Sequence, residues 1–137
     1  MVREAAIFSE DLNNKHIEHS VVEDTAEKST LKIFINMGEL TYNVYVIAES
    51  DHTMTFRITD LAKFTDEQTG SAIQLCNALN RDVRWAKFYL SADNEIIIDD
   101  NEVSNDSMTA ETIFALVGRN MQTAGTAFAE LKKAGLA

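Results

Sequence analysis

The sequence predicts an α+β protein in which one antiparallel sheet is packed with helices. Three stretches of alternating apolar and polar residues follow one another between residues 31 and 59, with short polar turns between them. Helix-like apolar stripes occur near both ends of the chain and once in between. Because the strands cluster and do not alternate one to one with helices, an antiparallel sheet is favoured. The predicted order is α-β-β-β-β-α-β-β-α, in a single domain spanning residues 1–137.

The first predicted helix spans residues 4–14. Ala5, Phe8 and Leu12 fall on one face of it, and acidic residues occupy the rest. Residues 16–22 alternate in the manner of a short strand, and residues 23–29 are polar. We therefore expect a helix, a strand and then a turn or loop.

Three strands are predicted at residues 31–37, 42–48 and 53–59. They are separated by Gly38-Glu39 and by the polar residues 49–52. Turns this short join antiparallel neighbours, so the three strands should form a meander. The third strand has the cleanest period of two, which indicates that one face of the sheet meets water.

A second helix is predicted to begin at a capping box. Thr65 is its N-cap, with Gln68 three residues later, and the helix should end near Asn80. Two further strands are expected at residues 84–90 and 95–99, with a tight polar turn at 91–94. A polar loop should follow over residues 101–107.

The last predicted helix begins at Ser107 or Thr109 and ends at Gly135. Its apolar residues recur in steps of three and four, which is typical of a helix with one buried face. That stripe consists of Phe114, Val117, Met121, Ala124, Phe128 and Leu131. Such a stripe more often packs into a core than binds a partner, and we expect a core role here.

The charge of the chain argues against a nucleic-acid partner. Its formal net charge is −10, and its Lys and Arg residues form no basic patch. No apolar run approaches the roughly 18 residues of a membrane span, and the N-terminus lacks the apolar core of a signal peptide. The single cysteine weakly favours a reducing compartment. The sequence thus predicts a cytoplasmic protein with no nucleic-acid or membrane partner.

We find no pattern of residues that predicts catalysis, a cofactor or a metal site. His16 and His19 are three residues apart on a predicted strand, which places their rings on opposite faces. Cys76 lies on the apolar stripe of a helix without a nearby base, as a structural cysteine does. The acidic residues between Asp93 and Asp106 lack the glycine of a calcium loop, and we expect them to form a solvated edge.

Several local patterns resemble the YbjN family. They are the strand–turn–strand unit at residues 31–48, the helix exit LCNALN at 75–80, and the pair AKFYL at 86–90 and EIII at 95–98. The closing helix, with FAEL at 128–131, is also similar. The resemblance covers nearly the whole chain. Two departures are the absence of the usual Gly before the first strand and Asp93-Asn94 in a turn that usually holds Gly.

The resemblance implies a fold like that of type III secretion chaperones and a function without catalysis. Members of the YbjN family have been named sensory-transduction regulators. Chaperones of the related fold are small, acidic, cytosolic dimers that hold extended segments of client proteins. The resemblance therefore implies a homodimer that binds a protein client, whose identity the sequence does not give.

Four aromatic residues on the predicted strands, together with one lysine, are the candidates for such binding. Phe34, Tyr45, Trp85, Lys87 and Tyr89 alternate with the most obvious core positions of their strands. Sheets that carry aromatic residues outward often form dimers or bind a strand. The alternative is a small-molecule-binding or regulatory domain with a pocket between the sheet and the helices, which requires convergent polar groups and a shifted pKa.

Overall fold

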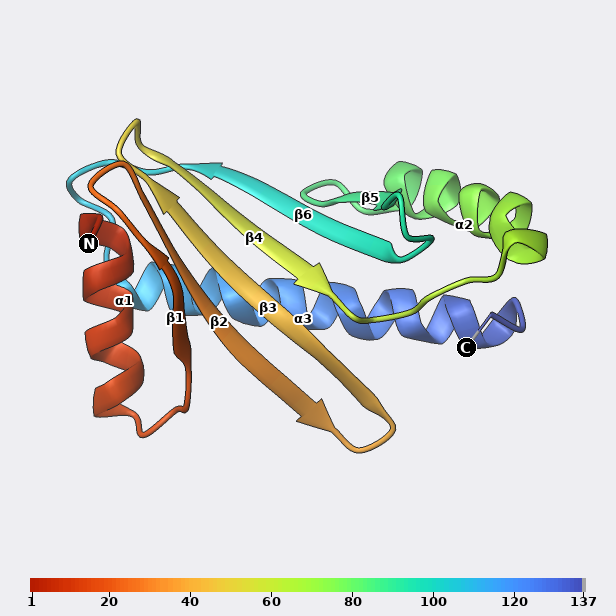
Figure 1. Ribbon diagram of the computed structural model, residues 1–137, viewed down its shortest axis with the longest axis horizontal. Helices are drawn as coiled ribbons and strands as arrows, with labels where there is room; N and C mark the ends of the chain where they lie inside the picture. Colours follow the sequence, from red (N-terminus) through yellow and green to blue (C-terminus); the bar gives the residue numbers. More distant parts are fainter. Residues whose placement is uncertain (137) are drawn as a thin grey trace.

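The computed structural model describes residues 1–136, and its helices and strands follow the predicted order (Figure 1). Within these residues the elements are α1 (Arg3–Asn14), β1 (Ser20–Asp24), β2 (Lys28–Met37), β3 (Leu40–Glu49), β4 (Thr53–Thr59), the short 3-10 helix η1 (Asp66–Gln68), α2 (Thr69–Asp82), β5 (Lys87–Leu90), β6 (Ile96–Val103) and α3 (Ala110–Lys133). The predicted α+β class is confirmed.

All six strands form one antiparallel sheet in the order β1-β2-β3-β4-β6-β5. β1 to β4 are neighbours in sequence and in space, as a meander requires. β6 lies between β4 and β5, so the hairpin of β5 and β6 adds to the meander through its second strand. Two edges result, β1 on one side and β5 on the other.

Helices α1 and α3 cover one face of the sheet. Both contact β3, and they also contact each other, while α3 runs behind the strands in Figure 1. The residues that face them form a continuous buried row across five strands: Ile33, Val44, Ile58, Ile98 and Phe88. Burial of this apolar area is the main term that stabilises the fold. We call the opposite side of the sheet the outer face.

The prediction for residues 16–29 was wrong in detail. β1 begins four residues later than expected, because residues 15–17 form the C-terminal cap of α1. His16 has a φ of 57°, and the N–H of Ile17 donates to the carbonyl of Leu12 at 2.9 Å. The turn or loop expected at 23–29 is a tight hairpin turn between Asp24 and Lys28. Thr25 holds it together, because its Oγ1 accepts from the N–H of Lys28 at 3.0 Å.

Element ends in the second half also differ from the prediction. The capping box of Thr65 and Gln68 is confirmed, but it heads η1, and α2 continues past Asn80 to Asp82. β5 begins at Lys87, three residues later than expected. β6 runs through Val103, into the residues expected to form a loop. The strand tolerates two consecutive aspartates there because each is paired with an arginine on its own face of the sheet.

α3 buries a face that is slightly rotated from the predicted stripe. Thr109 caps it, accepting from the N–H of Thr112 at 3.1 Å. Val117, Ala124 and Leu131 are buried as expected, whereas Phe114 is 37% exposed and the additional buried positions are Ile113, Asn120, Thr123 and Ala127. A straight helix repeats every 3.6 residues, so a stripe extrapolated in steps of three and four drifts around its axis.

Candidate functional site

Four of the five residues predicted to bind a partner lie together on the outer face. Phe34 comes from β2, Tyr45 from β3, and Lys87 and Tyr89 from β5. Their placement follows from the pairing register, which sets each of them opposite residues that point away from α1 and α3. Phe34 is 60% exposed, and the two tyrosines are half-buried.

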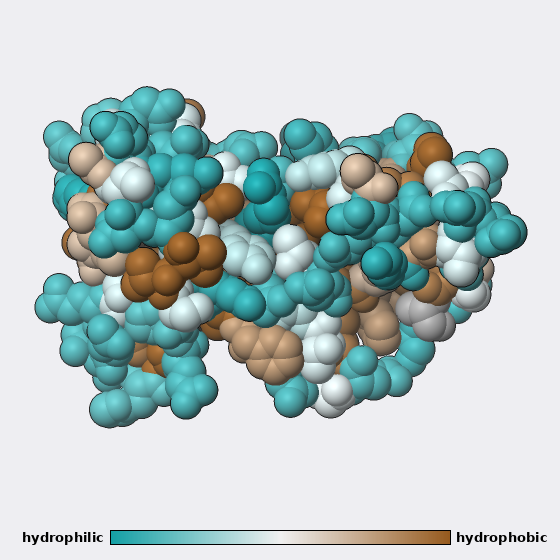
Figure 2. Space-filling view, in the orientation of Figure 1, coloured by the Kyte–Doolittle hydropathy of each residue, from teal (hydrophilic) through white to brown (hydrophobic). Residues whose placement is uncertain are grey.

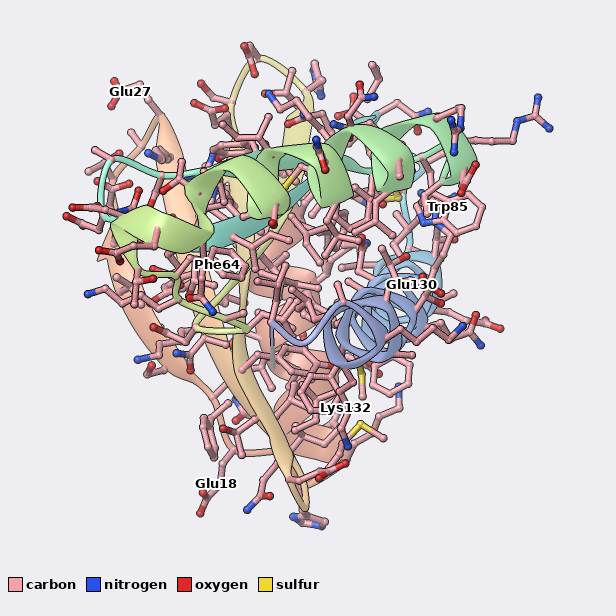
Figure 3. All side chains as sticks on the ribbon, turned by 90° about the vertical axis from the view of Figure 1, so that its right-hand side faces the viewer. Glu18, Glu27, Phe64, Trp85, Glu130 and Lys132 are labelled. Carbon is pink, nitrogen blue, oxygen red and sulfur yellow. The ribbon has the colours of Figure 1, made fainter. Side chains whose placement is uncertain are left out.

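Trp85 lies apart from these four. It precedes β5, so the alternation of that strand does not govern its side chain. Its indole Nε1–H donates to Oγ1 of Thr123 on α3 at 2.9 Å, and the Arg119 guanidinium lies 5.2 Å from the ring. Figure 3 shows the indole beside α3, near the C-terminal end of α2. The structure therefore places Trp85 at the β5 edge and not among the aromatic residues of the outer face.

An ion pair at the centre of the outer face was not foreseen from the sequence. Arg57 binds Asp99 through two parallel bonds, Nε to Oδ1 at 2.8 Å and Nη2 to Oδ2 at 3.1 Å. The hydroxyl of Tyr89 donates to the same Oδ2 at 3.1 Å. Burial, with the nearby charge of Asp99, raises the pKa of Tyr89. The phenol is therefore a neutral donor that, together with Arg57, fixes the carboxylate.

A shallow hollow lies beside this ion pair on the outer face. Apolar and aromatic groups and basic side chains line it together, and the lining includes Val22, Glu23, Lys28, Thr30, Tyr45, Ile47, Arg57 and Thr59. Figure 2 shows exposed hydrophobic atoms in the region of β1 and β2 on this side of the molecule. Val22 and Phe34, on these two strands, are more than half exposed. The outer face thus offers both apolar area and charge to a ligand.

The other face of β6 holds a buried polar cluster. Asp100 is 1% exposed, and its Oδ2 accepts from Nη2 of Arg119 at 2.7 Å and from Nδ2 of Asn120 at 2.8 Å. Arg119 also bridges to Glu102 at 2.8 Å. The prediction of a solvated acidic edge is wrong for Asp99 and Asp100, whose carboxylates are buried with arginine partners. This cluster fastens α3 to the sheet.

A groove runs between α2 and β5, where the alternative prediction of a small-molecule pocket would apply. Its lining is Thr69, Ile73, Cys76, Asn77, Asn80, Phe88, Leu90 and Asn94. Cys76 is 6% exposed, and burial raises the pKa of its thiol, which keeps it protonated and unreactive. Asn80 is already engaged, since its side chain binds the backbone of Phe88. The groove offers amide groups but no activated nucleophile.

His19, one of the two histidines considered as a metal pair, is engaged by groups of the protein itself. His19 is bound to Oγ of Ser9 at 2.9 Å and to the carbonyl of Ile17 at 3.0 Å. Among residues 1–136 there is no group of three histidine, cysteine or acidic side chains suited to a metal ion. Over the same residues no helix is both long enough and apolar enough to cross a membrane.

Comparison with known proteins agrees with this architecture of one sheet with helices on one face. The profile of the YbjN family, described as "Putative bacterial sensory transduction regulator", matches residues 9–133. A solved structure, "Crystal structure of YbjN, a putative transcription regulator from E. coli", superposes with a TM-score of 0.68 at 12% sequence identity, covering 96% of this chain and 93% of that one. A search of curated proteins found no match.

The chain has the fold of that solved structure, a single antiparallel sheet packed with helices, and the matching family is described as one of regulators. The family profile spans nearly the whole sequence, and the chain belongs to the YbjN family. The family resemblance found in the sequence is confirmed.

Proposed function

We propose that this chain is a non-catalytic module that regulates a protein client by binding it on the outer face of the sheet. The observation that carries the proposal is the exposure of Phe34 beside the half-buried Tyr45, on a face that α1 and α3 leave uncovered. Aromatic residues of this kind supply much of the binding energy in protein interfaces.

The absence of an activated group at the outer face supports a binding role. Arg57 and Asp99 neutralise each other, and Tyr89 is held as a hydrogen-bond donor to the same carboxylate. A general base needs a free lone pair, and both carboxylate oxygens of Asp99 already accept hydrogen bonds from Arg57 and Tyr89. The family description as a regulator points the same way.

Site-specific photo-crosslinking in cells that express the protein natively tests this proposal. A benzophenone side chain at Tyr45 reports on the outer face, and the same group at Phe114, on the exposed side of α3, is the matched control. We expect a discrete crosslink to a protein from position 45 and none from position 114. Adding Phe34→Ser should remove the crosslink at 45, because it deletes the exposed ring on the neighbouring strand.

Two results would contradict the proposal. One is a crosslink at position 114 with none at 45, which would move the binding surface to the helices. The other is a crosslink at 45 that Phe34→Ser leaves unchanged, because the exposed ring would then contribute nothing to binding.

A further inference from the structure

The outer face differs in charge from the rest of this acidic chain. The chain has 12 Lys and Arg against 22 Asp and Glu residues, a net charge of −10. The strands place four of those basic residues on the outer face, Lys28, Lys32, Arg57 and Lys87, and three of the acidic ones, Glu23, Glu49 and Asp99. Four minus three leaves this face at +1. Asp60, whose Oδ2 accepts from Asn43 and Thr59 at the end of the same face, brings this balance to zero, so the face is nearly neutral on an acidic molecule.

The basic groups are arranged in one row across the strands. Pairing sets Lys32, Tyr45, Arg57, Asp99 and Lys87 directly side by side, from β2 through to β5. Neighbouring strands are about 4.8 Å apart, so successive cations in the row are separated by two strand spacings, roughly 10 Å. Asp99 neutralises Arg57 within the row, so the free positive groups are Lys32 and Lys87 at its two ends, four strand spacings or roughly 19 Å apart.

Two of these cations lack a carboxylate partner. Lys32 lies over the ring of Tyr45 with its Nζ 6.0 Å from the centroid, and Lys87 lies over Tyr89 at 5.1 Å. Neither forms an ion pair with any residue that the structure describes. The aromatic rings attract the ammonium groups through cation–π interactions and leave their positive charge in place. Both charges are available to a ligand.

We propose that the outer face binds an extended, acidic segment of a protein partner that crosses the strands along this row. Carboxylates six residues apart in an extended chain point to the same side and lie roughly 20 Å from one another, which matches the four strand spacings between Lys32 and Lys87. Apolar side chains between them would pack on Tyr45 and in the hollow beside it. This inference rests on the proposed function, and it specifies that the bound segment of the partner is acidic and extended.

Other occupants fit the charges less well. A nucleic acid is a long polyanion, and beyond the row it would meet the acidic remainder of the surface. A second copy docked by the same face would add two more cations, its own Lys32 and Lys87, that have no ion-pair partner among the described residues. A short acidic segment confines its charge to the row.

Fluorescence anisotropy with synthetic probes tests this inference on the full chain. The probe is a fluorescein-labelled 12-residue peptide of repeating Glu-Ser-Val, compared with Gln-Ser-Val, Lys-Ser-Val and a 12-nucleotide oligothymidylate. We expect the Glu peptide to bind most tightly, with an affinity that falls as salt is added. Lys32→Glu combined with Lys87→Glu should weaken it roughly tenfold, because two attractive contacts become repulsive.

The matched control is Arg81→Glu combined with Lys133→Glu, which changes the net charge equally at exposed helix positions away from the sheet. We expect less than a twofold effect from it. Equal weakening by both double variants would overturn the inference, since only overall charge would then matter. So would tighter binding of the Gln or Lys peptide, tighter binding of the oligothymidylate, or no binding of the Glu peptide. Each of these results leaves the crosslinking test of the proposed function to be decided separately.

Discussion

The side chain of Asn80 binds backbone groups of the edge strand β5. Its Oδ1 accepts from the N–H of Phe88 at 2.7 Å, and its Nδ2 donates to the carbonyl of the same residue at 2.9 Å. The amide thus occupies both outward backbone groups of Phe88 as a further strand would. Unpaired edge groups invite association with other chains. The sequence predicted that Asn80 ends the helix. In the structure Asn80 instead binds the backbone of Phe88, eight residues further along the chain.

We expect Asn80→Ala to destabilise the protein by about 1 kcal/mol, because two backbone hydrogen bonds at the β5 edge lose their partner. Urea unfolding monitored by circular dichroism measures the change. Asn77→Ala, an exposed position on the same helix, is the control and should cost less than about 0.5 kcal/mol. Equal costs for the two variants would show that the amide of Asn80 does not stabilise the edge.

Tyr42 gives the fold a dependence on alkaline pH. Burial raises the pKa of its phenol from 10.0 to about 12. Between those values the unfolded chain loses the proton while the folded protein keeps it, so stability present below pH 10 is lost as pH rises toward 12. At about 1.4 kcal/mol for each pKa unit, the full loss across these two units is roughly 3 kcal/mol.

Tyr42→Phe isolates this contribution from that of other titrating groups. Within the described residues the hydroxyl is buried and has no hydrogen-bond partner, so its removal should change stability at pH 7 by less than about 1 kcal/mol. Urea unfolding at pH 7 and at pH 11 should show a smaller alkaline loss for the variant than for the unaltered chain. Parallel losses in the two proteins would refute the assignment to Tyr42.

At the scale of elements, the contact between β6 and α3 rests on a buried charge. Arg119→Met keeps an unbranched side chain against Trp85 but leaves Asp100 with Asn120 alone. We expect a loss of about 2–4 kcal/mol in the free energy of unfolding, because a buried carboxylate loses its cation. Thermal and urea unfolding both report it.

Two further variants sharpen this experiment. Arg81→Met removes a cation from the exposed pair with Asp82 and should cost less than about 0.5 kcal/mol. Adding Asp100→Asn to Arg119→Met should recover part of the loss, since the uncompensated charge disappears. If the double variant is no more stable than Arg119→Met alone, the buried charge is not the cause.

The elements themselves could largely be predicted, because each depends on a local period of two or 3.6 residues. Their ends were less predictable. β6 continues to Val103 only because Arg57 and Arg119, from β4 and α3, neutralise Asp99 and Asp100. β1 begins later than predicted because the residues before it cap the C-terminal end of α1. Tertiary contacts thus decide where β6 ends, and the left-handed residue His16 decides where β1 begins. The alternation of apolar and polar residues shows neither.

For the whole molecule, the alternation of the strands was enough to predict most of the candidate site. Phe34, Tyr45, Lys87 and Tyr89 lie on one face because each takes the outward phase of its strand. The ion pair of Arg57 and Asp99 could not be predicted from the sequence. Its two residues are 42 positions apart, and the sequence does not show which strands are neighbours in the sheet. Once β6 is known to lie beside β4, the pair follows directly from the register.

We also propose that the chain forms a homodimer, as the family resemblance implies. Size-exclusion chromatography with light scattering should give twice the chain mass of 15.3 kDa at micromolar concentration. The variant Lys32→Glu/Lys87→Glu should give the same mass, because the proposed acidic segment and not a second copy occupies that row. A monomeric mass at all concentrations would contradict the dimer.

Hydroxyl-radical footprinting tests whether a partner covers the outer face of the sheet in the cell. Oxidation of Phe34, Tyr45 and Tyr89 inside native cells is compared with that of the purified, dilute chain, with the exposed Phe114 as the internal reference. Because a bound partner shields the sheet, we expect lower oxidation of the three outer-face residues in cells and no change at Phe114. Protection of Phe114 with unchanged oxidation of Phe34 and Tyr45 would contradict this expectation.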